Sequence, residues 1–292
     1  MLSNMLNEKD RAHYIHPVVS MRDHEARGVT VMRSGKGVFL TDDNGNELLD
    51  GFAGLWCVNA GYGHESVVEA AAEQMRRLPY ATGYFHFGSE PAIKLAAKLA
   101  ELSPGDLNRV FFTLGGSDAV DTVIRMMRYY FNARGETSKK QVIALEKGYH
   151  GSTSTGAGLT ALPVFQDMFD VPMPWQHHIP SPYPYRNGLS TDAEIIAQGV
   201  ANLKAKVAEL GAENVAAFIM ELVQGSGGVI VLPEGYAKAM QETCRELGVL
   251  FIVDEVITAF GRTGPMFACE HEGLTPDFLT TAKGLTSGYA PM

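Results

Sequence analysis

The sequence predicts an α/β protein whose core is a mostly parallel β-sheet with helices on both faces. From about residue 110 onward, short apolar runs alternate with longer amphipathic segments. The apolar runs are continuous, and continuous runs are typical of strands buried on both sides of a sheet. With 292 residues and 46% hydrophobic content, the chain is large enough for one large core or two smaller ones.

The N-terminal part shows a different pattern. Residues 1–30 are mixed and polar, with no clear period. An Asn-Gly pair lies between the short apolar runs 37–41 and 47–50, which predicts a β-hairpin because both turn residues tolerate positive φ. Residues 64–78 follow a helical period, and Ser89 is expected to cap the next helix.

The remaining elements alternate along the chain. The expected strands cover residues 110–113, 142–145, 216–222, 249–254 and 278–281, and the expected helices cover residues 117–131, 194–210 and 233–247. Proline-rich residues 161–190 are expected to form an ordered surface excursion. Ligands of parallel sheets bind beyond the carboxyl ends of the strands, so polar residues at those ends are the candidate site.

Composition excludes several classes of protein. A net charge of −9 argues against a general nucleic-acid binder, which would normally carry a basic stripe. The three cysteines are far apart and form no CxxC pair, so neither a disulfide framework nor a zinc site is indicated. No apolar run reaches the ~18 residues of a membrane span. We therefore expect a cytoplasmic protein with no metal and no nucleic-acid or membrane partner.

Two strand ends carry the most informative residues. One apolar run delivers Asp254 to its end, and a second delivers Lys283 beside Gly284. A buried acid is costly without a partner, which would be a protonated pyridine nitrogen or a metal. Adjacent residues of a strand point to opposite faces, so Asp254 and Glu255 are not expected to share one metal. A buried lysine is a nucleophile, although a lone lysine at a strand end is more often simply exposed.

Three further strand ends add weight to these two. Residues 113–119 read as a strand, a Gly-Gly turn and a helix start, which suits a phosphate but also describes an ordinary turn. Tyr149 could stack on a pyridine ring or belong to a polar loop. Glu221 could contact a cofactor or be a solvated acid. The sequence Gly156–Ala161 fits G-x-G-x-x-A, but no expected strand precedes it and Pro163 is expected to prevent a helix, so a nicotinamide site is not indicated.

Taken in order, these features resemble those of the class III (omega) aminotransferases, which are pyridoxal-phosphate enzymes of fold type I. The resemblance runs from about Val38 to the last residue. Its most specific parts are FIVDEVITAFGRTG at 251–264 and TAKGLTSGYAP at 281–291. It implies an N-terminal segment with a hairpin over 1–60 and a cofactor-binding large domain over 61–292.

The resemblance also implies roles for the residues that carry it. Lys283 would be the Schiff-base lysine and proton carrier, and Asp254 would be the partner of the pyridine nitrogen. Val256 and Tyr149 would pack on the two faces of the ring. The remaining implied contacts are Gly116 and Ser117 with the phosphate, and Glu221 and Gln224 near the oxygen side of the ring.

Substrate residues are implied by one branch of this family, which uses pyruvate as acceptor and amines or omega-amino acids as donors. Trp56, Tyr84 and Phe85 match positions that line the substrate pocket in that branch. The expected reaction is therefore transamination to a keto acid, with pyruvate favoured, in a homodimer or larger assembly. A racemase, mutase or decarboxylase with the same cofactor, and a non-catalytic remnant, stay open as alternatives.

Some features depart from the family pattern. The phosphate turn usually reads Asn-Ser-Gly-Ser-Glu, whereas residues 114–118 read Leu-Gly-Gly-Ser-Asp, and the usual Glu-Pro pair is Glu221-Leu222. In relatives the lysine is followed by a further strand inside the sheet and by a small C-terminal domain with a carboxylate-binding arginine. We therefore expect a large domain truncated shortly after Lys283, poorly soluble and with weak or no turnover in isolation.

Overall fold

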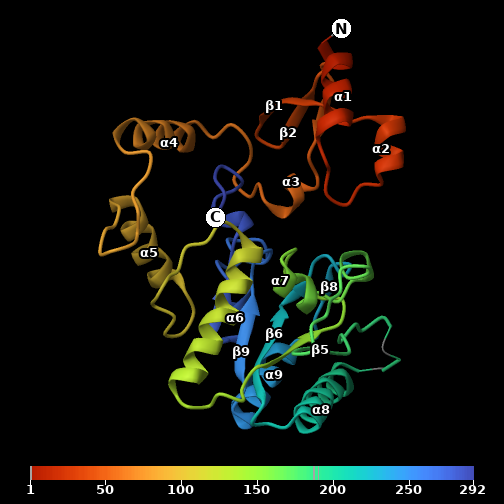
Figure 1. The fold of residues 1–292 in the computed structure, drawn as a ribbon, viewed down its shortest axis with the longest axis vertical. Helices are drawn as coiled ribbons and strands as arrows, with labels where there is room; N and C mark the ends of the chain where they lie inside the picture. The colour runs from red at the N-terminus through yellow and green to blue at the C-terminus, as the bar shows by residue number, and fades with distance from the viewer. Residues whose placement is uncertain (1, 187, 190) are drawn as a thin grey trace. The chain divides into compact units, whose positions relative to one another are not determined.

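The computed structural model describes residues 2–186, 188–189 and 191–292 (Figure 1). Contacts divide the chain into two compact units, residues 1–79 and residues 80–292, which are described separately below. The boundary expected after residue 60, between an N-terminal segment and a cofactor-binding large domain, stays a prediction.

The first unit contains the expected hairpin within a three-stranded antiparallel sheet of order β1-β2-β3. Its elements are α1 (Leu2–His13), α2 (Met21–Arg27), β1 (Met32–Lys36), β2 (Phe39–Asp42), β3 (Glu47–Leu49), α3 (Ala53–Trp56) and α4 (Glu65–Arg77). The turn is held by Asp42, whose Oδ1 accepts hydrogen bonds from the N–H groups of Asn44 at 2.9 Å and Asn46 at 2.8 Å. Helix α4 confirms the helix predicted over residues 64–78. The elements α1 and α2 were not predicted, because residues 1–30 show no clear period, and β1 was not predicted either.

The second unit is built on a five-stranded sheet of order β10-β9-β6-β4-β5, with every neighbouring pair parallel (Figure 1). Its strands are β4 (Gln141–Leu145), β5 (Gln176–Ile179), β6 (Val215–Glu221), β9 (Leu250–Asp254) and β10 (Phe278–Thr280), and a separate small pair is formed by β7 (Val223–Gln224) and β8 (Ile230–Val231). The α/β expectation is confirmed. Strand β5 was missed because it lies inside the proline-rich segment.

The helices of this unit are α5 (Glu90–Leu102), α6 (Gly116–Ala133), α7 (Ser154–Leu159), α8 (Asp192–Leu210) and α9 (Tyr236–Leu247). Helices α6 to α9 cover the two faces of the sheet. Alternate strand residues pack in two separate clusters, as the period of a strand requires. Phe218 and Phe251 join α8 and α9 on one face, whereas Ile219 and Ile252 join α6 and α7 on the other.

Three helix predictions are confirmed with small shifts. Residues 117–131 lie in α6 and residues 194–210 lie in α8. Helix α9 begins at Tyr236, later than expected, because the residue before it, Gly235, has a left-handed φ of 85°. None of the described helices is long and apolar enough to cross a membrane.

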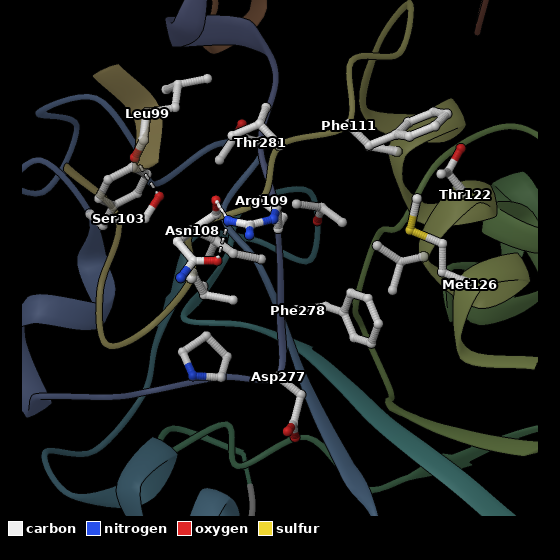
Figure 2. Close-up of a pocket in the computed structure, with 18 of the residues that line it drawn as sticks. Leu99, Ser103, Asn108, Arg109, Phe111, Thr122, Met126, Asp277, Phe278 and Thr281 are labelled. Atoms are coloured by element: carbon white, nitrogen blue, oxygen red, sulfur yellow. Dashed lines mark hydrogen bonds between the residues drawn. The ribbon is translucent and has the colours of Figure 1, made fainter. Parts of the chain in front are cut away.

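The strand expected over residues 110–113 is not formed. Instead, this segment lines one side of a groove of about 780 Å³ whose other wall includes β10 and the residues around it (Figure 2). Figure 2 shows Phe111 and Phe278 among the side chains along this groove. A strand needs a partner about 4.8 Å away to pair its N–H and C=O groups. Within the described residues, 110–113 has no such partner, which explains the wrong prediction.

Candidate active site

Two buried carboxylates lie side by side at the carboxyl edge of the large sheet. Glu221 ends β6, Asp254 ends β9, and the two are direct register partners. Each is only 4% exposed. On the next strand Thr280 is the register partner of Asp254, and Lys283 follows three residues later at the start of a short 3₁₀ turn. The topology therefore brings Glu221, Asp254 and Lys283 to one edge, as the sequence predicted.

Asp254 is held by a histidine that the sequence analysis did not single out. His150 Nδ1 lies 2.8 Å from Asp254 Oδ2, and the N–H of Val256 donates to Oδ1 at 3.1 Å. The N–H of His150 donates to Thr160 Oγ1 at 2.8 Å, which fixes the loop. An ionised carboxylate only accepts, so the proton of the imidazole belongs on Nδ1. His150 directly follows Tyr149 beyond the end of β4, and this position was the one sequence feature that could have identified it as a site residue.

Glu221 is buried, which excludes the solvated-acid interpretation. Its Oε1 accepts from the N–H of Tyr149 at 2.8 Å and its Oε2 from the N–H of Gly225 at 3.0 Å. Burial and, to a smaller extent, the nearby charge of Asp254 raise the pKa of Glu221, and His150 and the two N–H groups lower it, so that the pKa rises to about 7. One of the two neighbouring acids is thus paired with a histidine, and the other holds its proton more tightly.

The Tyr149 loop is fixed on several sides. The Tyr149 hydroxyl lies 3.0 Å from Ser152 Oγ, and its ring meets Phe165 edge-on at 5.0 Å. Gln224, which is fully buried, donates to the carbonyl of Glu146 at 2.8 Å. These contacts place Tyr149 and Gln224 on the loops that surround Glu221.

Small residues let the first turn of α6 approach this edge. A Cβ added to Gly116 would lie 2.9 Å from a methyl carbon of Val256. A Cβ added to Gly151, which has a left-handed φ of 126°, would lie 2.7 Å from Ser117 Oγ. Ser117 Oγ accepts from the N–H of Ser152 at 3.0 Å, so its own proton is left to donate elsewhere. Gly116, Ser117, Val256 and the Tyr149 loop are therefore one packed group at a helix N-terminus, where an anion is favoured.

Glu255 belongs to a different network, as the strand period predicted. Its Oε1 accepts from the N–H of Cys269 at 2.8 Å, and its Oε2 accepts from the N–H of Ala268 at 2.7 Å and from the Thr258 hydroxyl at 2.9 Å. Its carboxylate therefore ties residues 268 and 269 to the end of β9 and takes no part in the group around Asp254.

The G-x-G-x-x-A sequence has a packing explanation. Gly156 and Gly158 lie in α7, so the expectation that Pro163 prevents a helix there is wrong. The missing side chain of Gly158 makes room for the buried side chain of Gln176. Gly158 therefore serves the contact between α7 and β5, whereas a Cβ on Gly156 would lie 2.7 Å from the carbonyl oxygen of His150, so Gly156 serves the contact with the preceding loop.

The substrate residues implied by the resemblance lie in different units. Trp56 is in the first unit, with its ring edge-on to Phe52 at 6.3 Å. Tyr84 and Phe85 are in the second unit, are 74% and 84% exposed, and have ring centroids 6.0 Å apart. Their shared role in a substrate pocket stays a prediction.

The His150–Asp254 contact is expected to stabilise the fold. In His150→Gln the hydrogen bond of a buried carboxylate is lost or weakened, so we expect the free energy of unfolding to fall by about 1–3 kcal/mol. Urea unfolding followed by circular dichroism measures this, and the exposed His86→Gln is the matched control. An unchanged midpoint for His150→Gln would contradict the pairing.

The raised pKa of Glu221 predicts a pH dependence of stability. Its usual value is 4.5 and its value in the fold is about 7. Between these values the folded chain keeps a proton that the unfolded chain has released, so the free energy of unfolding falls as pH rises through this window. The total is of order 3 kcal/mol.

Urea midpoints measured from about pH 4.5 to about pH 7 test this titration window. Glu221→Gln removes the titrating group and should flatten the slope, whereas Glu146→Gln, an exposed acid in the next loop, should keep it. A slope of the same size in Glu221→Gln would assign the dependence to another group.

Comparison with known proteins was made by sequence and by structure. The putrescine–pyruvate aminotransferase of Pseudomonas aeruginosa is 44% identical over 97% of this chain, and the diaminobutyrate–2-oxoglutarate transaminase of Halomonas elongata is 40% identical over 98%. The chain spans 62% of the length of each of these relatives.

Solved structures agree with these sequence relatives. An (S)-enantioselective omega-transaminase from Thermomicrobium roseum superposes with a TM-score of 0.97 at 42% identity, covering 99% of this chain and 65% of that one. An omega-transaminase from Pseudomonas jessenii in complex with PMP gives a TM-score of 0.96 at 39% identity, covering 98% and 64%. The model of the family "Aminotransferase class-III", whose members depend on pyridoxal phosphate, matches residues 20–292. The chain belongs to the class III aminotransferases, with the fold of the type I pyridoxal-phosphate enzymes.

Proposed function

We propose that the protein containing this chain is a pyridoxal-phosphate-dependent transaminase that moves an amino group from an amine or omega-amino acid to a keto acid. The observation that carries the proposal is the buried Asp254–His150 pair at the carboxyl edge of the sheet, with Lys283 following the adjacent strand. Family membership supports the same reaction class.

The residues at this edge fit the cofactor. His150 Nε2 and Thr280 Oγ1 are buried and have no hydrogen-bond partner within the described residues. Two polar atoms of residues that contact or pair with Asp254 are therefore left to form a hydrogen bond with a ligand. The first N–H groups of α6 have no partner within the helix and suit a phosphate, and the missing side chain of Gly116 makes room for Val256 beside them. The candidate residues therefore match an aromatic ring that carries a phosphate at one end and a basic nitrogen at another.

Each residue has a role that follows from its chemistry. When bound, pyridoxal phosphate supplies an aldehyde and a ring that withdraws electrons from the reacting carbon. Asp254, with its charge oriented by His150, holds the proton on the ring nitrogen. Lys283 supplies the amine nucleophile and moves a proton at its Nζ. Gly116 and Ser117 would hold the phosphate, and Tyr149 and Val256 would pack against the ring.

The substrates belong to the proposal as well. Pyruvate is the favoured acceptor, because one relative is a putrescine–pyruvate aminotransferase, although another uses 2-oxoglutarate. Trp56, Tyr84 and Phe85 are proposed to line the substrate pocket. An engineered omega-transaminase with the same fold, in which one tryptophan is replaced by glycine, serves the synthesis of bulky amines, which supports a tryptophan in this role.

Assembly and location complete the proposal. Exposed apolar side chains gather along one stretch of the second unit, namely Tyr80, Tyr84, Phe85, Phe87 and Ile93. Exposed apolar side chains concentrated in one segment are of the kind that a subunit interface covers. We therefore propose a homodimer or larger assembly, located in the cytoplasm.

Replacing the lysine tests the cofactor site. In Lys283→Ala, prepared in the protein expressed from its complete reading frame, we expect turnover to fall by about 10²–10⁴-fold, the usual contribution of a general acid–base group. We also expect the loss of the borohydride-sensitive visible absorbance that the wild type keeps after dialysis.

The matched control is Lys98→Ala on α5, which should keep both properties. If the wild type shows no such absorbance, the non-catalytic alternative is correct. If Lys283→Ala keeps the absorbance and the turnover, the assigned residue is wrong.

The acceptor is tested by product analysis. With putrescine as donor, we expect alanine to form from pyruvate at least about tenfold faster than glutamate forms from 2-oxoglutarate, a preference worth about 1.4 kcal/mol. The reverse preference would contradict pyruvate but keep the transaminase. Racemisation or decarboxylation with no new amino acid would favour the other pyridoxal-phosphate enzymes.

A further inference from the structure

Three side chains of types that can bind a metal converge within the first unit. Asp10 lies on α1, His16 lies in the connection that follows, and His24 lies on α2. One ligand atom from each residue lies within 4.8 Å of the other two. Asp10 and His16 are half-buried, and His24 is 3% exposed.

The contacts inside this cluster are unusual for a hydrogen-bonded group. Asp10 Oδ1 lies 2.8 Å from His16 Nε2 in a hydrogen bond. Asp10 Oδ2 lies 3.0 Å from His24 Nε2, but this pair lacks hydrogen-bond geometry, and both atoms are buried with no hydrogen-bond partner among the described residues. Buried polar atoms without a partner are rare and costly. Two ligand atoms that are close together but not aimed at each other are the arrangement found around a shared cation.

We propose that Asp10, His16 and His24 bind a divalent first-row transition-metal cation, with zinc as the best match. Imidazole nitrogens suit this class, whereas magnesium and calcium prefer oxygen ligands. Zinc–ligand bonds of about 2.0–2.1 Å in a tetrahedron place the ligand atoms about 3.3 Å apart. The two imidazole nitrogens lie 2.8 and 3.0 Å from different oxygens of Asp10, and one ligand atom of each residue lies within 4.8 Å of the other two, so a small contraction would bring one oxygen and both nitrogens to this spacing. Three protein ligands leave a fourth position for water.

The surrounding structure holds the ligands in place. Asn7 Oδ1 accepts from the N–H of Val29 at 2.9 Å, which joins α1 to the chain just after α2. Ser20 caps α2 through the N–H of Asp23. His16 needs its proton on Nδ1 to bind the cation, which replaces the present hydrogen bond to Asp10. Bound in this way, the cation links α1, the following connection and α2.

The cysteine spacings and the adjacent acids of the sequence indicate no metal site, and no metal was expected on that basis. The spacing of Asp10, His16 and His24 matches no common metal motif, and only folding brings them together. The proposal is independent of the transaminase proposal, because neither ligand set contains a residue of the other.

Cobalt provides the test. The full chain is stripped with a chelator, dialysed and titrated with Co²⁺, followed by its visible ligand-field absorption and by isothermal titration calorimetry. We expect one Co²⁺ per chain at this site, displaced by Zn²⁺. His24→Gln should weaken binding by at least about tenfold. His13→Gln, which changes an exposed histidine at the end of α1, should bind as the wild type does.

Two results would overturn the site. One is the absence of stoichiometric binding by the wild type, which would leave Asp10 hydrogen-bonded to His16 alone. The other is equal binding by His24→Gln and wild type, which would place the ion elsewhere, for example at a free cysteine. Circular dichroism checks that His24→Gln folds. If it does not, His16→Gln, which changes a more exposed ligand, gives the same comparison.

Discussion

The cost of burying two neighbouring carboxylates governs the carboxyl edge of the large sheet. Glu221 and Asp254 are register partners on adjacent parallel strands, so their side chains leave the sheet together. The two acids avoid mutual repulsion in different ways. Asp254 is paired with His150, and Glu221 has its pKa raised to about 7 while accepting two backbone hydrogen bonds. These contacts position the loops after β4 and β6. The hydrogen bonds that the two carboxylates require therefore determine the structure of this edge of the sheet.

Much of this fold could be predicted from the sequence because buried parallel strands and amphipathic helices leave strong periodic signals. β4, β6, β9 and β10 were all expected, since each is a continuous apolar run. β5 carries two histidines within a proline-rich stretch, so its pairing with β4 is a tertiary effect. Residues 110–113 look like a strand but lack a partner beside β10 in the described chain.

The site could be predicted in part for a related reason. Residues at strand ends can be named from the pattern, because the carboxyl ends of parallel strands share one edge. That reasoning found Asp254, Glu221 and Lys283. It did not find His150, because a histidine one residue beyond an aromatic carries no periodic signal. Only the path of the loop, fixed by Thr160 and by the tight approach of Gly151 to Ser117, turns this ring toward the acid.

The carboxylates of the two proposed sites differ in how completely they are hydrogen-bonded. At the sheet edge Asp254 forms a hydrogen bond with His150 Nδ1. The atoms without a hydrogen-bond partner are His150 Nε2 and Thr280 Oγ1. In the first unit the carboxylate itself is incompletely bonded, because Asp10 Oδ2 faces His24 without a hydrogen bond. A paired acid suits an organic cation, which needs a fixed negative charge. In the other case a carboxylate oxygen and a neighbouring imidazole nitrogen both lack a hydrogen bond. This arrangement suits a metal ion, because a metal ion binds both atoms at once.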